Sequence, residues 1–100
     1  MLYMILCHDK PDSLELRQQN RPAHLDYING AADRLRFVGP ILTSDENPQP
    51  AGSLLVIEAA SEMAVRLFAE NDPYATAGLF ASVEIRPWKA VTGTWVSEDA

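Results

Sequence analysis

The chain has 100 residues, of which 47% are hydrophobic and 22% are charged, as is typical of one globular domain and not of a disordered segment. The net charge of −6 is spread along the chain and argues against nucleic acids and anionic membranes as partners. We therefore expect one domain over residues 1–96, followed by a frayed tail at residues 97–100.

The cysteine content and the first residues bear on localisation. Cys7 is the single cysteine, so no internal disulfide can form and nothing indicates an oxidising compartment. The apolar run at residues 1–7 has no basic residue before it and is followed by Asp9-Lys10-Pro11. It is also too short to span a bilayer. We therefore predict a cytoplasmic protein whose first element is a buried strand.

The next part of the chain predicts a strand and a helical region in two parts. Residues 2–8 are apolar on both faces of an extended chain, so this strand needs cover on both sides. Asp12, with Glu15 three residues later, resembles a capping box and marks a helix start. Proline disfavours helical geometry in the residue before it, so the Arg21-Pro22 step is expected to interrupt this helix and begin a second stretch.

Two more strands separated by a loop are expected in the middle of the chain. Residues 37–43 form the first of them, and the Gly39-Pro40 step inside it is typical of an edge strand or a bulge. Residues 44–52 have the composition of a loop. Residues 53–59 are apolar on both faces and predict a further strand that is covered on both sides.

The last part of the chain predicts a helix, a strand and a short tail. Ser61 is expected to cap a helix over residues 62–71. The inward positions of this helix are predicted to be Ala64, Leu67 and Phe68. Residues 79–86 alternate and predict a strand limited by Pro87. One face of this strand is predicted to carry Leu79, Ala81, Val83 and Ile85. Residues 91–96 are expected to add a short extended segment.

The order β-α-β-β-α-β predicts an α+β fold with a four-stranded antiparallel sheet and two helices on one face. Helices on one face leave the other face of the two apolar strands uncovered. A second copy of the chain is the simplest cover, so we predict a homodimer packed through its sheets.

His24 is a candidate for general acid–base chemistry. It lies at helical spacing from Ile28, Ala31 and Leu35 and so begins an apolar stripe that faces a core or a cleft. Imidazole titrates near neutral pH, which suits a group that exchanges protons with a substrate. The alternative is a structural histidine with satisfied hydrogen bonds.

Asp72 has two interpretations. It follows Phe68 at helical spacing and precedes Pro73. An Asp before a Pro is typical of the cap of a short helix, here one that ends near Gly78. The alternative is a carboxylate that orients His24 and stabilises its charged form.

Other side chains are candidates for ligand contacts. Ser53, Arg21 and Tyr74 are the polar and aromatic ones, although each also suits a structural or surface role. His8 and Asp9 end the first strand without the spacing of a zinc motif, so no metal is expected. The sequence has no Gly-rich phosphate loop, so no nucleotide cofactor is expected either. Cys7 is interpreted as an inert apolar residue.

The segments that carry a family resemblance cover nearly the whole chain. They are residues 1–9, Arg21-Pro22-Ala23-His24-Leu25, Gly39-Pro40, Gly52-Ser53, Asp72-Pro73-Tyr74, Ala77-Gly78-Leu79-Phe80 and Arg86-Pro87-Trp88. In this order they resemble the YCII-related (YciI-like) family. The resemblance implies a ferredoxin-like dimeric α+β barrel, similar to muconolactone-isomerase-type folds. It also implies a cleft between helices and sheet that holds a paired His and Asp.

The resemblance implies roles for individual residues. The family's histidine falls on His24 and its aspartate on Asp72, which favours the acid–base interpretation, and Ser53 matches a ligand contact. Some relatives act on hydroxylated aromatic rings or similar small molecules. This chain differs from better-known members in a shorter loop after Gly39-Pro40 and in an extra tail at residues 91–100, so the resemblance implies no particular substrate.

Two functions are consistent with the sequence. In the first, the chain is a cofactor-independent enzyme of isomerase or lyase type. His24 then exchanges a proton with a small cyclic or aromatic substrate, and Asp72 orients it. In the second, the chain is a non-catalytic dimeric module that binds a small ligand or a partner protein, and Asp72 is chiefly a helix cap.

Overall fold

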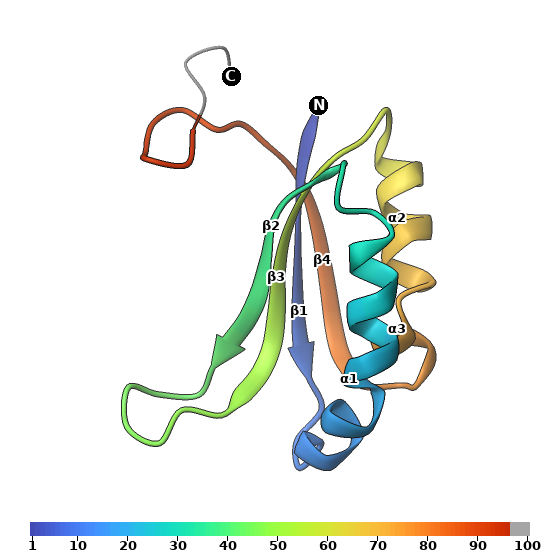
Figure 1. Cartoon of the computed structure of the whole chain (residues 1–100), viewed down its shortest axis with the longest axis vertical. Helices are drawn as coiled ribbons and strands as arrows, with labels where there is room; N and C mark the ends of the chain where they lie inside the picture. Colours follow the sequence, from blue (N-terminus) through green and yellow to red (C-terminus); the bar gives the residue numbers. More distant parts are fainter. Residues whose placement is uncertain (97–100) are drawn as a thin grey trace.

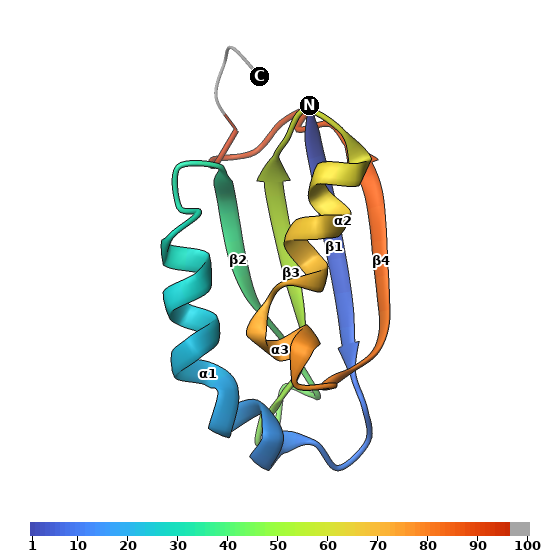
Figure 2. The same cartoon turned by 90° about the vertical axis from the view of Figure 1, so that its right-hand side faces the viewer.

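A computed structural model describes residues 1–96 of the chain. Its elements are β1 (Leu2–Asp9), α1 (Leu14–Asn29), β2 (Leu35–Leu42), β3 (Pro50–Glu58), α2 (Glu62–Glu70), α3 (Pro73–Thr76) and β4 (Phe80–Trp88). The strands form one antiparallel sheet in the order β2-β3-β1-β4. All helices lie on one face of the sheet (Figures 1 and 2). This arrangement confirms the predicted ferredoxin-like α+β class.

The hydrophobic core lies between the sheet and the helices. Alternate residues of β1 and their register partners in β3 point toward the helices, as the period of two in a strand requires. The buried side chains of this layer are Tyr3, Ile5, Cys7, Leu55 and Ile57, and the helices add Ile28, Val65 and Phe68. The opposite face of the sheet is bare in Figure 1. Leu2, Met4 and Leu6 point to it and are only half-buried.

Two predictions about α1 are wrong. The predicted capping box does not form, because Asp12 has a left-handed backbone (φ 55°) and Ser13 is the N-cap residue, without a side-chain cap bond. The helix also runs without interruption through Pro22. Pro22 removes the N–H that would bond to the carbonyl of Gln18. Both residues are exposed, so water can satisfy that carbonyl and the helix continues.

The edge position of the strand that contains Pro40 is confirmed, because β2 lies at one end of the sheet. β3 begins at Pro50, three residues before the predicted start, so its first part includes residues expected to form a loop.

The prediction of an extended segment at residues 91–96 is wrong. These residues form turns, in which the N–H of Val96 donates to the carbonyl of Gly93 at 3.1 Å. The predicted frayed tail lies outside the described residues.

The helical cap at Ser61 is confirmed, since its hydroxyl accepts a hydrogen bond from the N–H of Ala64 at 3.2 Å. The predicted inward face of α2 is only partly right. Phe68 is buried as expected, but Val65 is fully buried in place of Ala64, and Leu67 is 51% exposed. The buried stripe of α2 carries Val65 and Phe68, and the packing of the helix against the sheet selects it over the neighbouring apolar stripe.

The alternation predicted for the last strand is interrupted at its start. β4 pairs with β1, and their register shifts between His8 and Asp9. Leu79 is fully buried before the strand begins, and Phe80 packs against the core while Ala81 is exposed. Within residues 1–96, no helix combines the length and the apolar character needed to cross a membrane.

Replacement of Gly52 by alanine is predicted to destabilise the fold. A Cβ at this position would lie 2.3 Å from the main-chain oxygen of Cys7, an approach that the two central strands relieve only by moving apart. We expect Gly52→Ala to lower the free energy of unfolding by about 1–3 kcal/mol, as overpacking of a core typically does. Urea unfolding followed by circular dichroism measures this.

Gly39→Ala is the matched control, because a Cβ at Gly39 meets nothing within 4 Å. Its free energy of unfolding should change by about 0.5 kcal/mol or less. Equal losses in the two variants would contradict the close approach as the reason that Gly52 is a glycine.

Candidate functional site

His24 and Asp72 form a buried pair. Nδ1 of His24 lies 2.8 Å from Oδ1 and 3.0 Å from Oδ2 of Asp72, and the two residues are 6% and 4% exposed. His24 comes from the middle of α1, and Asp72 stands between α2 and α3. Because an ionised carboxylate has no proton to donate, Nδ1 is the donor of this hydrogen bond. The neutral imidazole then has its free lone pair on Nε2.

Nε2 of His24 keeps an accessible edge. Among residues 1–96, every fully buried side-chain nitrogen or oxygen has a hydrogen-bond partner. Nε2 makes no hydrogen bond to any of these residues, so it is not fully enclosed. The pair therefore combines an oriented, hydrogen-bonded nitrogen with one that has no hydrogen-bond partner among residues 1–96.

Asp72 also caps α3, so its two proposed roles coexist. Its Oδ1 accepts a hydrogen bond from the main-chain N–H of Tyr74 at 2.9 Å while it faces His24. The cap fixes the direction of the carboxylate through the backbone of the helix that it begins. The predicted cap is confirmed as a structural feature, and it is what aims the carboxylate at the imidazole.

Tyr74 packs against the same imidazole. Its ring stacks on that of His24 with centroids 3.9 Å apart and an interplanar angle of 14°. The guanidinium of Arg17 lies over the Tyr74 ring, 4.6 Å from its centroid. Arg17 and His24 are two turns apart on α1, about 10 Å along its axis, which leaves room for one ring between them. Burial raises the pKa of the Tyr74 phenol, although the charges of Arg17 and Arg21 act in the opposite direction.

Arg17 is the residue of this site that the sequence analysis missed. Its Nε and Nη2 donate to the two carboxylate oxygens of Asp9 at 2.7 and 3.2 Å. Nη2 also donates to the main-chain oxygen of Gly52 at 2.7 Å and to Oγ of Ser53 at 2.8 Å. Both side chains of the ion pair are 6% exposed. A signal for it was present, because Arg17, Arg21 and His24 share one helical stripe.

The other side chains considered for the site lie on β3, α1 and β1. Ser53 is buried on the helix face of β3 and accepts from Arg17, which leaves its own O–H free to donate. Arg21 is exposed, one turn before His24 on α1. Cys7 is buried, and burial, assisted by the charges of Asp72 and Asp9, raises the pKa of its thiol to about 12. That value is consistent with the inert role predicted for this thiol.

Clusters of metal-ligating side chains and cavities can each mark a binding site. Over residues 1–96, no three His, Cys, Asp or Glu side chains are grouped so that they could hold a metal ion. A cavity of about 630 Å³ lies on the bare face of the sheet, and a groove of about 330 Å³ lies beside Tyr27 and Phe68. Neither is lined by His24 or Asp72.

Comparison with known proteins gives consistent matches over most of the chain. The family model described as YCII-related domain matches residues 1–89. Protein YciI of Escherichia coli O6:H1 is 40% identical over 97 residues, which cover 91% of this chain and 99% of that protein. An uncharacterized protein of Haemophilus influenzae is 36% identical with the same coverage.

One solved structure is similar in both sequence and fold. It is the 5-chloro-2-hydroxyhydroquinone dehydrochlorinase of Burkholderia phenoliruptrix in complex with 2,5-dihydroxybenzoquinone. It superposes with a TM-score of 0.85 and 38% identity, covering 89% of this chain and 94% of that one.

The tautomer of His24 tests the geometry of the pair. In the wild type we expect the neutral ring to carry its proton on Nδ1. In Asp72→Ala both oxygens that face Nδ1 are removed, so the tautomer protonated on Nε2 should gain population. Long-range ¹H–¹⁵N NMR of ¹⁵N-histidine distinguishes the two tautomers. His8, exposed at the end of β1, is the internal control and should not respond. An unchanged His24 tautomer would contradict the donor–acceptor assignment.

Proposed function

We propose that this chain, which belongs to the YCII-related domain family as its motifs predict, is an enzyme that performs acid–base chemistry on a small cyclic or aromatic substrate. The observation that carries the proposal is the buried His24–Asp72 pair, with Nδ1 held at 2.8 Å from the carboxylate and Nε2 without a partner among residues 1–96. A histidine oriented in this way is a general base whose charged form is stabilised by the carboxylate.

The proposed chemistry begins with a proton transfer to Nε2 of His24. The O–H or C–H bond of the substrate breaks, the proton moves to Nε2, and the electron pair stays on the substrate. In an isomerisation the imidazolium returns the proton to another atom of the same molecule. In an elimination the electron pair forms a double bond while an anionic leaving group departs with its bonding electrons, and the imidazolium releases the proton to water. Neither course needs a redox partner.

The substrate class is proposed from the similar solved structure. Its name gives a chlorinated, hydroxylated ring as substrate, and its bound molecule is a dihydroxylated quinone. We therefore extend to this chain a small, hydroxylated ring and a reaction of elimination or isomerisation type. The shared fold and 38% identity support the substrate class. The specific ring is left to the assay.

Arg21, Ser53 and Tyr74 are proposed to contact the substrate. Arg21 is an exposed cation one turn from His24, which suits an ionised hydroxyl group on the ring. The free O–H of Ser53 is a donor for a ring oxygen. Tyr74 is proposed to contact the substrate through the edge of its ring, because its two faces are covered by His24 and Arg17.

Catalysis by His24 is tested with purified protein and a panel of hydroxylated rings that includes 5-chloro-2-hydroxyhydroquinone. We expect turnover of at least one member, measured by absorbance and, for chlorinated rings, by chloride release. His24→Gln should lower kcat by about 10²–10⁴-fold, the usual contribution of a positioned acid–base group. Asp72→Asn should also lower kcat, because it removes the carboxylate charge that stabilises the imidazolium.

His8→Gln is the matched control and should keep the wild-type kcat, since His8 is exposed at the end of a strand. Full activity in His24→Gln would contradict the acid–base role. A wild type that binds 2,5-dihydroxybenzoquinone but turns over no member of the panel would instead favour the non-catalytic binding module.

A homodimer is the second part of the proposal. The bare face of the sheet carries apolar side chains of the two central strands, and Leu54 on this face is 37% exposed. Burial of such a face against a second copy removes apolar surface from water on both chains. The dimer is therefore proposed to pack sheet against sheet, with the helices and the His24 site on the outside.

Sedimentation equilibrium at micromolar concentration tests the dimer. We expect a mass of about twice the 11.1 kDa of one chain. Leu54→Asp places a charge at the centre of the proposed interface and should give a monomer. Leu67→Asp is the matched control, because Leu67 is 51% exposed on α2 and should leave the dimer intact. A monomeric wild type would contradict this part of the proposal.

A further inference from the structure

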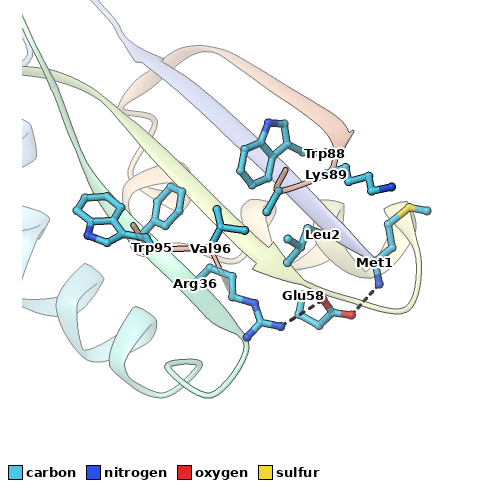
Figure 3. Close-up of a pocket in the computed structure, with 10 residues that line it drawn as sticks. Met1, Leu2, Arg36, Glu58, Trp88, Lys89, Trp95 and Val96 are labelled. Carbon is cyan, nitrogen blue, oxygen red and sulfur yellow. Dashed lines mark hydrogen bonds and ion pairs between the residues drawn. The ribbon is translucent and has the colours of Figure 1, made fainter. Parts of the chain in front are cut away.

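The cavity of about 630 Å³ on the bare face of the sheet is separate from the His24 site (Figure 3). It is lined by Met1, Leu2, Arg36, Phe37, Glu58, Trp88, Lys89, Ala90, Trp95 and Val96. It lies at the end of β1 that begins with Leu2, whereas Asp9 and Arg17 lie at the other end. A strand of 8 residues spans about 25 Å, so the two sites are far apart as well as on opposite faces.

The walls of this cavity are aromatic. Its floor is a row of paired strand residues, since Leu2 pairs with Glu58 on one side and with Trp88 on the other. The segment after β4 turns back over this row and places the ring of Trp95 5.6 Å from that of Phe37, at an angle of 53°. Figure 3 shows Trp88 and Trp95 on opposite sides of the hollow.

The lining of the cavity comes from both sides of the end of the family match. The family model ends at residue 89, and Ala90, Trp95 and Val96 line the cavity from beyond it. The other lining residues lie within the matched part of the chain.

The charged groups around the cavity are mostly cationic. Glu58 accepts a hydrogen bond from the amino group of Met1 at 2.7 Å and pairs with Arg36 at 3.6 Å. The amino group of Met1, followed by Arg36, lowers the pKa of Glu58, so its one negative charge is shared by two cations. Lys89 has no ion-pair partner among residues 1–96. This excess of positive charge occurs in a chain whose net charge is −6.

We propose that this cavity is a second binding site and that it takes a small planar aromatic anion. Two indoles and a phenyl ring supply faces on which a planar ring stacks. Arg36 and Lys89 supply charged donors for a carboxylate or another acidic group of that ring. The volume lies within the range of pockets that bind small molecules. The proposal does not depend on catalysis at His24.

The two tryptophans of the chain, Trp88 and Trp95, both line the cavity, so their indole signals report on it directly. The probe is 2-naphthoate, titrated into the full chain and followed by the two indole N–H peaks in ¹H–¹⁵N NMR. The neutral isostere 2-naphthamide is the matched ligand. We expect saturable shifts of both indole peaks with the acid and at least about tenfold weaker binding of the amide, because the amide lacks the charge that the cations recognise.

Variants assign the binding to the cavity. Lys89→Gln and Arg36→Gln should each weaken 2-naphthoate binding by about tenfold. Both side chains lie on the surface, and Arg36 is 55% exposed, so folding is preserved. Arg66→Gln removes a cation on α2 that does not line the cavity and should leave the affinity unchanged. His24→Gln should also leave it unchanged, which separates this site from the proposed catalytic one.

Three results would overturn the proposal. The first is the absence of saturable indole shifts up to millimolar 2-naphthoate. The second is equal affinity for acid and amide, which would make the cavity an apolar surface without charge recognition. The third is movement of the same peaks on dilution of the protein alone, together with a change in sedimentation. That result would assign the cavity to contacts with a second copy of the chain.

Discussion

The arrangement of the helix face depends on the burial of one cation. The guanidinium of Arg17 is withdrawn from water, and an unpaired charge in that position would cost several kcal/mol. The chain compensates with the carboxylate of Asp9 and with two oxygens from Gly52 and Ser53, more than thirty residues away in the sequence. These bonds fix the start of α1 against the ends of the two central strands. The close approach of those strands at Gly52 belongs to the same arrangement.

The same cation helps to position the histidine. Its guanidinium covers one ring, Tyr74, which in turn stacks on the imidazole of His24. The other restraint on the imidazole is Asp72, whose single oxygen Oδ1 accepts both from the backbone of α3 and from Nδ1. A carboxylate held by a helix start cannot rotate away without breaking the cap. The helix cap and the contact with His24, which are alternatives when only spacing is considered, are therefore made by one carboxylate in the folded chain.

The strands and the buried position of His24 could be predicted from the sequence because their signals are local. Period-two alternation and a proline in an edge strand depend on neighbouring residues alone. The place of Arg17 does not follow in the same way, because Pro22 predicts a helix break. Helical spacing relates Arg17 to His24 only if one continuous helix contains both residues. A helix that ends at Pro22 would remove this relation. The sequence does not specify the buried face of α2, because two apolar stripes adjoin and only tertiary packing decides between them. The contact between His24 and Asp72, 48 residues apart, likewise depends on the packing of α1 against α3, which no local pattern specifies.

The two faces of the sheet differ in what they expose and bury: the helix face encloses polar groups, and the opposite face leaves apolar side chains accessible. On the helix face, polar groups are enclosed and each needs a partner, which produces a hydrogen-bonded cluster around the imidazole of His24. On the bare face, apolar side chains are accessible and need cover. Its centre, around Leu54, suits a second copy of the chain, whereas its end is already partly covered by the segment that carries Trp95. The proposed dimer and the proposed ligand site therefore concern different rows of one sheet, the row of Leu54 at the centre and the row of Leu2 at the end.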